Sequence, residues 1–470
     1  MIKFGTSGFR AIMGEDFTKE NVVKIAYAIT KYFKETKIKK PSVVVGYDNR
    51  FMSDMYAKWL SEVLAEKNIF VCLYSKSVPS PLISYMTKDF DLGVMITSSH
   101  NPYYYNGVKI FIRPAKEVDE TFTSKIEMWA NEDISIKTKT FEEYLNSGKI
   151  ALTDNIKDYC DSILKFINPN KTKNLKFKIL YNSMNGNSNE CLEYIFKKMK
   201  VNFASMNTNV DPYFRHMLPS PYKHNLKDEI EKIKKEKFDV GFALDGDSDR
   251  ISVIDSKGNF IDGNFILPIL FYYFKKYKNY NGGLVKNTAL SNLSLKLAKY
   301  FNEECYNAKT GFKHIGKILD STSAFLGGES NGIAFKEHVK SKDGIIAAAL
   351  LVDMMAESGK KIEDILAEIQ SLVKFKSDVV EYAYPISAKQ KSEIMHKLFE
   401  ENKTPKLNKI LNISRDGEFR INFENDYWAM IRFSGTENVV RIFAEQKNLK
   451  ECNKIVCELE KFIGVTEKQK

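Results

Sequence analysis

The chain has 470 residues, of which 43% are hydrophobic and 28% charged, a globular composition with room for about three domains. Its six cysteines form no CxxC pair, which argues against a zinc site or a disulfide framework and favours a reducing compartment. The net charge of +11 is spread over many lysines without an aromatic-rich basic stripe, so nucleic acid is not the expected partner.

No secretory leader is recognisable in the first residues, and we expect a cytoplasmic protein. The longest apolar stretch, near Ile345–Ala356, is too short to span a bilayer and contains Asp353. We therefore expect no membrane partner and a monomer or homodimer.

The first 150 residues alternate between helical and strand periodicity, which predicts a helix-covered and largely parallel sheet. A helix is predicted around residues 22–33. It is followed by a strand at Ser42–Gly46, a helix near Ala57–Leu64, a strand at Ile69–Tyr74, a short helix at Leu82–Met86 and a strand at Leu92–Thr97.

After the polar stretch Asn131–Gly148, the alternation of predicted strands and helices begins again twice. The first restart predicts strands at Phe177–Tyr181, Val201–Ala204 and Asp239–Leu244, with helices at Glu190–Lys198 and Leu226–Lys237. The second predicts helices near Phe265–Phe274, Leu293–Phe301 and Gly344–Ala356. The last hundred residues differ, because two strands at Glu418–Phe423 and Tyr427–Phe433 precede a third strand and a helix, as in a small α+β unit.

Asp245, Asp247 and Asp249 come directly after a predicted apolar strand, with one small residue between each pair. A tight loop can turn three such carboxylates onto one point, and Mg²⁺ prefers hard oxygen ligands of this kind. A calcium-binding EF-hand is disfavoured, because its twelfth position requires glutamate and is Ser256 here. The pattern favours a metal site over a solvated acidic turn.

Three further segments follow predicted strands, where open α/β sheets bind their ligands. Thr97–Pro102 offers Ser99 as a nucleophile beside His100, although an ordinary serine turn is equally compatible with this segment. Arg432–Asn438, with Arg441 beyond it, has the small residues and arginines of a phosphate-binding loop. Gly327–Gly332 is a polar loop that could bind sugar hydroxyls. At the N-terminus, Phe4–Arg10 could place Arg10 near a phosphate.

Taken in the order in which they occur along the chain, these segments resemble the α-D-phosphohexomutase superfamily, on its phosphoglucomutase/phosphomannomutase branch. The resemblance runs from Phe4 to about Glu445. It implies three consecutive α/β domains with mixed sheets and a smaller C-terminal α+β domain around a central cleft. The corresponding boundaries are 1–148, 149–254, 255–372 and 373–470.

The resemblance also implies a reaction in which phosphorylated Ser99 exchanges its phosphoryl group with a hexose phosphate. Catalysis would involve Ser99, His100, Lys109 and Arg10, and Mg²⁺ would be held by Ser99, Asp245, Asp247 and Asp249. Glucose 1,6-bisphosphate would act as activator. The substrate-binding residues implied are Arg250, Lys313, Glu329, Asn331, His338, Arg432, Ser434, Gly435, Thr436 and Arg441.

Departures from the family pattern bear on which sugar the enzyme prefers. Asn331 stands where many members have serine, Phe312 and Ile333 stand where some have histidine, and Asn438 replaces a proline. His338 could take over a histidine's role in binding substrate or could be a structural residue. The alternatives to a glucose or mannose mutase are a phosphoglucosamine mutase, a catalytically silent sugar-phosphate binding protein and a net phosphatase.

Overall fold

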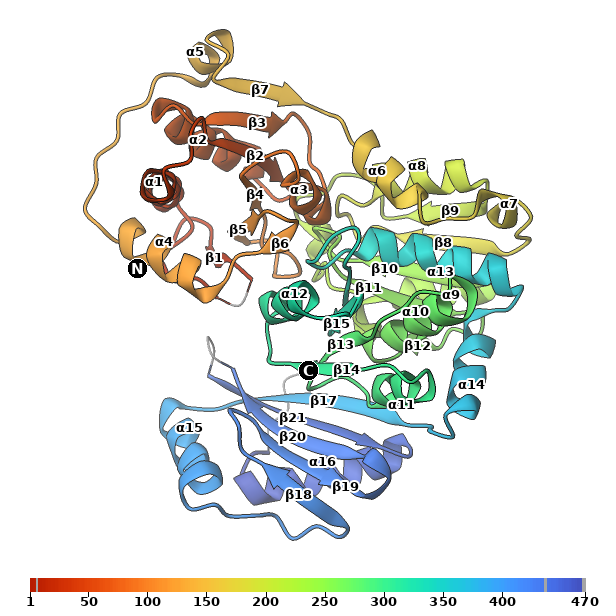
Figure 1. The fold of residues 1–470 in the computed structure, drawn as a ribbon. Helices are drawn as coiled ribbons and strands as arrows, with labels where there is room; N and C mark the ends of the chain where they lie inside the picture. Colours follow the sequence, from red (N-terminus) through yellow and green to blue (C-terminus); the bar gives the residue numbers. More distant parts are fainter. Residues whose placement is uncertain (6, 435–437, 467–470) are drawn as a thin grey trace. The chain divides into compact units, whose positions relative to one another are not determined.

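The computed structural model describes residues 1–5, 7–434 and 438–466, which form two compact units. The first unit comprises residues 1–287 and 303–366, and the second comprises residues 288–302 and 367–470. Each unit has its own hydrophobic core, and Figure 1 traces the chain through both.

The N-terminal part of the first unit is a seven-stranded mixed sheet in the order β1-β5-β4-β2-β3-β7, with β6 paired to β5. Strands β2, β3, β4 and β7 run parallel, whereas β5 is antiparallel to both β1 and β4. The strands are β1 (Phe9–Ile12), β2 (Ser42–Tyr47), β3 (Phe70–Tyr74), β4 (Leu92–Ile96), β5 (Tyr105–Ile112), β6 (Lys116–Glu117) and β7 (Ile150–Thr153).

Helices on this sheet carry the apolar periodicity that the sequence predicts. The first of them begins after Thr18, whose hydroxyl accepts a hydrogen bond from the Asn21 backbone N–H, and it buries Val22, Ile25 and Ile29. The helices of this part are α1 (Lys19–Thr36), α2 (Ser53–Glu66), α3 (Ser80–Met86), α4 (Glu120–Ala130) and α5 (Phe141–Asn146).

Two further mixed sheets complete the first unit. One has the order β12-β11-β10-β8-β9 and the other β14-β13-β15-β16, each with three parallel strands extended by antiparallel ones. The strands are β8 (Lys178–Asn182), β9 (Asn202–Met206), β10 (Val240–Leu244), β11 (Ile251–Asp255), β12 (Phe260–Ile261), β13 (Leu284–Asn287), β14 (Cys305–Ala308), β15 (Leu326–Glu329) and β16 (Gly332–Phe335). The helices are α6 (Lys157–Leu164), α7 (Pro169–Thr172), α8 (Asn189–Met199), α9 (Lys227–Glu236), α10 (Gly263–Tyr277), α12 (Phe312–Ser321) and α13 (Gly344–Ser358).

The apolar helix α13 is held inside the protein. The side chain of Asp343 caps its N-terminus by accepting hydrogen bonds from the backbone N–H groups of Ile345 and Ile346, and the helix contacts α7, α8 and α10. Among the described residues, no helix combines the length and the apolar character needed to cross a membrane.

The second unit is built on a five-stranded antiparallel sheet in the order β17-β21-β20-β19-β18. The buried Glu445 carboxylate joins helix α11 to this sheet, because it accepts hydrogen bonds from the Asn292 N–H at 2.8 Å and from the Trp428 indole at 2.6 Å. The elements are β17 (Asp378–Pro385), β18 (Ile410–Ser414), β19 (Phe419–Phe423), β20 (Trp428–Phe433), β21 (Val439–Gln446), α11 (Leu293–Tyr300), α15 (Ala388–Met395) and α16 (Leu449–Ile463). Helix α14 (Ile362–Leu372) connects the units.

The expected fold class is confirmed, with three mixed sheets followed by a smaller C-terminal sheet domain. Two strand pairings cross the predicted domain boundaries. Strand β7 lies beyond residue 148 yet pairs with β3, and β12 lies beyond residue 254 yet pairs with β11. We therefore propose that the first domain ends after Thr153 and the second after Ile261.

Candidate active site

Ser99 lies at the carboxyl end of β4, in a loop that turns sharply. Its backbone has a φ of +53°, in the left-handed region that non-glycine residues rarely adopt. The side chain is buried, and its hydroxyl donates a hydrogen bond to Asp245 Oδ2 at 2.8 Å. The structure thus brings the candidate nucleophile against the first carboxylate of the predicted metal loop.

Asp245, Asp247 and Asp249 lie in the loop between β10 and β11, and one oxygen from each falls within 4.8 Å of the others. All three side chains are buried. Oδ1 of Asp247 and Oδ1 of Asp249 accept no hydrogen bond from any described residue. Buried carboxylate oxygens without a donor fit a hard divalent cation, so the donor set supports the predicted metal site.

The charges around this cluster oppose one another. Burial and the neighbouring Asp247 and Asp249 raise the pKa of Asp245 well above its ordinary value. Burial would also raise the pKa of Asp249, but Lys109, Lys342 and Arg250 hold it below the usual range. The raised pKa of Asp245 reflects repulsion among the three buried carboxylates, and a bound cation would relieve that repulsion.

Lys109, on β5, supplies a positive charge to the same carboxylates. Its Nζ lies 2.5 Å from Asp247 Oδ2 and 2.7 Å from Asp249 Oδ2. Burial opposes the charged form, but the two carboxylates raise the pKa of Lys109 above its ordinary value, so the side chain is an ammonium.

Two arginines and one histidine complete the surroundings. Arg10 Nη1 donates to Asn101 Oδ1 at 2.9 Å, and Arg250 Nε lies 3.7 Å from Asp249 Oδ1. Burial, together with Arg250 and Arg10, lowers the pKa of His100 well below its usual value. His100 is therefore neutral, and its Nδ1 has no hydrogen-bond partner among the described residues.

The polar loop after β15 also belongs to the first unit. Glu329 Oε2 accepts a hydrogen bond from the Gly311 backbone N–H at 2.9 Å, which links the loop to the start of α12. On that helix, Lys313 Nζ lies 2.7 Å from Glu120 Oε1 of α4. The structure thus places Lys313 in an ion pair.

The predicted phosphate loop begins in the second unit, where β20 ends. Arg432 and Arg441 are direct partners across β20 and β21, and Arg441 also pairs with Glu381. Like charges opposite one another in a sheet are unfavourable, so an anion would stabilise this pair. Lys391 Nζ donates to the Ser434 carbonyl at 2.8 Å. Gly435 and Thr436 lie outside the described residues.

Comparison with known proteins identifies the family. Models described as phosphoglucomutase/phosphomannomutase alpha/beta/alpha domains I, II and III match residues 1–136, 157–258 and 262–372. A phosphoglucomutase/phosphomannomutase of Thermococcus kodakarensis is 30% identical over 451 residues, which cover 95% of this chain and 94% of the relative. The chain belongs to the α-D-phosphohexomutase superfamily. It is accordingly a sugar-phosphate mutase, an isomerase acting on hexose phosphates.

Other relatives of this phosphohexomutase carry a different substrate name. A phosphoglucosamine mutase of Campylobacter curvus is 28% identical over 98% of both chains, and one of Methanocaldococcus jannaschii is 28% identical over 96% of both. Among solved structures, the fold matches a phosphoglucomutase/phosphomannomutase family protein of Burkholderia thailandensis, with a TM-score of 0.80, 21% identity and coverage of 98% and 97%. It also matches the Paramecium phosphoprotein parafusin, with a TM-score of 0.83, 19% identity and coverage of 99% and 96%.

Asn331 forms hydrogen bonds through both ends of its side-chain amide. Its Nδ2 donates to the Ser252 hydroxyl at 2.7 Å, and its Oδ1 accepts from the Gly263 backbone N–H at 3.1 Å. The side chain is buried, and both polar ends connect β11 to the start of α10. We therefore propose that Asn331 stabilises the framework of the mutase and does not contact the sugar.

His338 is also held by the framework. Its ring lies against Tyr85 and Tyr159, its Nε2 is 2.8 Å from the Ser162 hydroxyl, and its Nδ1 is 3.3 Å from Asp343 Oδ2. The imidazole is almost completely buried, so these contacts support the structural alternative over a role in binding substrate.

The mutase site contains polar residues that the sequence did not reveal. Ser80 donates from its hydroxyl to Asp247 Oδ2 at 2.5 Å, and Lys342 Nζ lies 3.4 Å from Asp249 Oδ2. Asp48 and Arg50 hydrogen-bond to the Ser99 loop, Asp48 through the Thr97 hydroxyl and Arg50 through the Ser99 carbonyl. Their position just after β2 is the signal that could have identified them, because ligands in α/β sheets bind at the carboxyl ends of strands.

Proposed function

We propose that this enzyme moves a phosphoryl group reversibly between the 1- and 6-positions of glucose or mannose phosphate, with Ser99 as the phosphoryl carrier. The observation that carries this proposal is the 2.8 Å hydrogen bond from the buried Ser99 hydroxyl to Asp245 in the carboxylate cluster. A serine in such a position lies next to the carboxylates that would hold a divalent cation beside its phosphate.

In this mechanism phosphorylated Ser99 transfers its phosphoryl group to a free hydroxyl of the bound sugar phosphate. The bond from phosphorus to Ser99 Oγ breaks, a bond from phosphorus to the sugar oxygen forms, and the hydroxyl proton leaves to a nearby base. The sugar bisphosphate then reorients, and its other phosphoryl group returns to Ser99. Added glucose 1,6-bisphosphate would act as activator by phosphorylating Ser99.

The charges of the site suit this transfer. Mg²⁺ bound by Asp245, Asp247, Asp249 and the serine phosphate would neutralise charge on the transferring group. Arg10 and Arg250 add positive charge beside it, because both guanidinium groups lie near the carboxylate cluster.

Two groups are suited to move the proton. The neutral His100 ring has a buried Nδ1 without a partner among the described residues, so it can accept a proton from the attacking hydroxyl. The Lys109 ammonium, held by two carboxylates, is the other candidate, and whichever group takes the proton in one direction returns it in the reverse direction. Lys313, paired with Glu120, is the weaker candidate.

The phosphate that does not react would be bound by Arg432, Ser434, Gly435, Thr436 and Arg441. Arg432 and Arg441 are cross-strand partners, and each can give a phosphate charge-assisted hydrogen bonds. Glu329 would accept hydrogen bonds from ring hydroxyls.

A phosphoglucosamine mutase is the second candidate, because several relatives at 28% identity over nearly the whole chain carry that name. Against it, residues Tyr105 to Lys109 read Y-N-G-V-K, where phosphoglucosamine mutases usually have D-N-G-I-K. The choice between the two depends on the amino group at position 2 of the sugar.

The test offers glucose 1-phosphate, mannose 1-phosphate and glucosamine 1-phosphate in parallel, with Mg²⁺ and a trace of the matching 1,6-bisphosphate. A Ser99→Ala enzyme serves as the control for contaminating activity. Turnover of the first two sugars supports the proposal. Turnover of glucosamine 1-phosphate alone assigns the enzyme to the amino sugar. If no sugar is turned over and Ser99 is not phosphorylated, the result favours a silent binding protein.

A further inference from the structure

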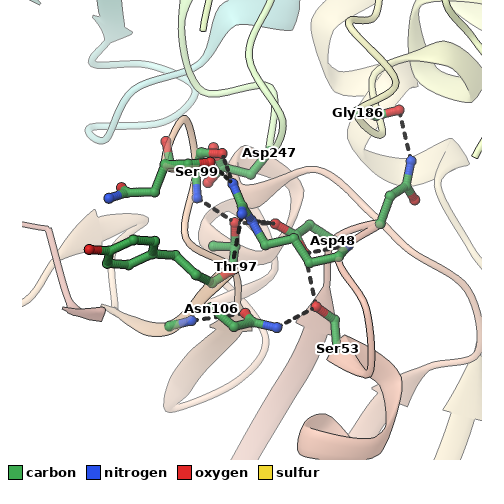
Figure 2. A network of polar contacts seen from close by, with 12 residues as sticks. Asp48, Ser53, Thr97, Ser99, Asn106, Gly186 and Asp247 are labelled. Atoms are coloured by element: carbon green, nitrogen blue, oxygen red, sulfur yellow. Dashed lines mark hydrogen bonds and ion pairs between the residues drawn. The ribbon is translucent and has the colours of Figure 1, made fainter. Parts of the chain in front are cut away.

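The segment Asp48-Asn49-Arg50 follows β2 and contacts both loops of the proposed reaction. All three residues are buried, with exposures of 1%, 7% and 3%. Among the described residues, none of the three donates or accepts a hydrogen bond with the carboxylate oxygens of the metal loop or with the Ser99 hydroxyl. Their hydrogen bonds go instead to the backbone and side chains that shape the two loops (Figure 2).

Arg50 binds the loop of Ser99 through four backbone carbonyls. Its Nη2 donates to Ser99 O and Asn101 O, both at 2.7 Å, and its Nη1 donates to Pro102 O at 2.7 Å and Tyr105 O at 3.0 Å. The Nε group donates to Asp48 Oδ2 at 3.2 Å. All five N–H donors of the guanidinium are therefore used, and four of them fix one short loop.

Asp48 extends this network to the backbone of the nucleophile. Its Oδ2 accepts a hydrogen bond from the Thr97 hydroxyl at 2.6 Å, and Thr97 Oγ1 in turn accepts from the Ser99 backbone N–H at 2.9 Å. Asp48 Oδ1 accepts from the Ser53 hydroxyl at 2.9 Å, which anchors it to the start of α2. The N–H and the carbonyl of Ser99 are thus both held, which stabilises its left-handed backbone conformation.

Asn49 reaches the other loop. Its Nδ2 donates to the carbonyls of Asn185 at 2.9 Å and Gly186 at 3.0 Å, in the segment after β8. Gly186 lies directly against the metal loop, because a Cβ added there would come within 2.7 Å of Gly246 O and 2.9 Å of Asp245 O. The segment between β2 and α2 therefore contacts the Ser99 loop through Arg50. Through Asn49 it contacts the turn at Asn185 and Gly186, which packs against the carboxylate loop.

We propose that Asp48, Asn49 and Arg50 form a positioning element that keeps the Ser99 loop in register with the carboxylate loop, with Arg50 as its main positioning residue. This inference rests on the proposed function, in which Ser99 carries the phosphoryl group. When a sugar bisphosphate phosphorylates Ser99, the bond from phosphorus to the sugar oxygen breaks as the bond to Ser99 Oγ forms, and the serine proton passes to the departing sugar oxygen. This step requires the serine oxygen in line with the breaking bond.

Lysine cannot replace arginine in this role. An ammonium group keeps the positive charge but has three donors around one point, whereas four carbonyls and a carboxylate surround the planar guanidinium. Arg50→Lys therefore keeps the positive charge at this position and removes the planar arrangement of hydrogen-bond donors. The guanidinium also lies 5.0 Å from the centre of the Phe214 ring, a contact that lysine reproduces less well.

The experiment follows phosphorylation of Ser99 by glucose 1,6-bisphosphate with rapid quenching and intact-protein mass, alongside kcat, KM and the melting temperature. A matched control is Arg415→Lys, since Arg415 also donates to two backbone carbonyls, of Leu398 and Asn402, and lies over a ring, that of Phe419. A second pair of variants is Thr97→Val, which removes the contact with the Ser99 N–H, and Thr97→Ser, which keeps it.

For Arg50→Lys we expect phosphorylation of Ser99 and kcat to fall together by about 100-fold, the size expected for a small misplacement of reacting groups, with KM changed less than about threefold. Arg415→Lys should match the wild-type rates. Thr97→Val should slow phosphorylation by about tenfold, and Thr97→Ser should recover most of it.

Normal phosphorylation in folded Arg50→Lys would overturn the proposal. If Arg50→Lys does not fold, the comparison of Thr97→Val with Thr97→Ser replaces it. Equal rates of Ser99 phosphorylation in these two variants would then refute the proposal. A wild-type enzyme that is never phosphorylated at Ser99 would instead refute the proposed function, so the two failures are distinguishable.

Discussion

Glu229 gives the enzyme a pH dependence of stability that can be worked out from its surroundings. This carboxyl lies on α9 and is completely buried; its Oε2 accepts one hydrogen bond, from Asn182 Nδ2 at 3.0 Å, and its Oε1 has no partner among the described residues. Burial raises the pKa of Glu229 to about 8, and the Asn182 hydrogen bond opposes this only in part.

The pKa of Glu229 is 4.5 in the unfolded chain and about 8 in the folded protein. The contribution of Glu229 to the unfolding free energy is therefore highest below pH 4.5 and falls as the pH rises from there to about 8, because the unfolded chain releases its proton first. One pKa unit corresponds to about 1.4 kcal/mol. Between pH 5 and pH 8 the wild type should therefore lose roughly 3 to 4 kcal/mol of unfolding free energy that Glu229→Gln does not lose.

The measurement is urea unfolding of both proteins at pH 5, 6.5 and 8, followed by circular dichroism. Glu231→Gln is the matched control, because it makes the same change on the same helix at an exposed position. The gap between Glu229→Gln and wild type should widen in favour of glutamine as the pH rises, while the control stays parallel to wild type. Parallel curves for all three proteins would refute the argument.

Three further substitutions test the site. Ser99→Ala should lower kcat by several orders of magnitude and prevent phosphorylation of the protein while leaving the melting temperature nearly unchanged; normal turnover would disprove the nucleophile. Asp247→Asn should weaken Mn²⁺ binding measured by electron paramagnetic resonance, and unchanged affinity together with activity in EDTA would remove this residue from the metal site. Asn331→Ala should cost about 1 to 3 kcal/mol of unfolding free energy without changing the ratio of kcat/KM between sugars, whereas a stable variant with altered preference would restore Asn331 to the sugar site.

The local pattern of the sequence was sufficient for the fold class and for locating the loops that the proposed chemistry uses. Strand and helix periods alternate over short windows, so the elements carrying the loops could be predicted within a few residues, as for Leu92–Ile96 and Val240–Leu244. Ser99 and the three aspartates are recognisable because each follows such a strand, and because alternating carboxylates have few other uses.

The tertiary structure decided which polar residues serve the site and which serve the framework. Arg50 and Glu229 are unremarkable in sequence, whereas Asn331 and His338 resemble substrate-binding residues there. The contacts of all four come from partners far away along the chain, such as the carbonyls about fifty residues after Arg50 and the Ser162 hydroxyl beside His338. Hydrogen bonding and burial at such separations depend on how the sheets pack, and local periodicity carries no information about that packing.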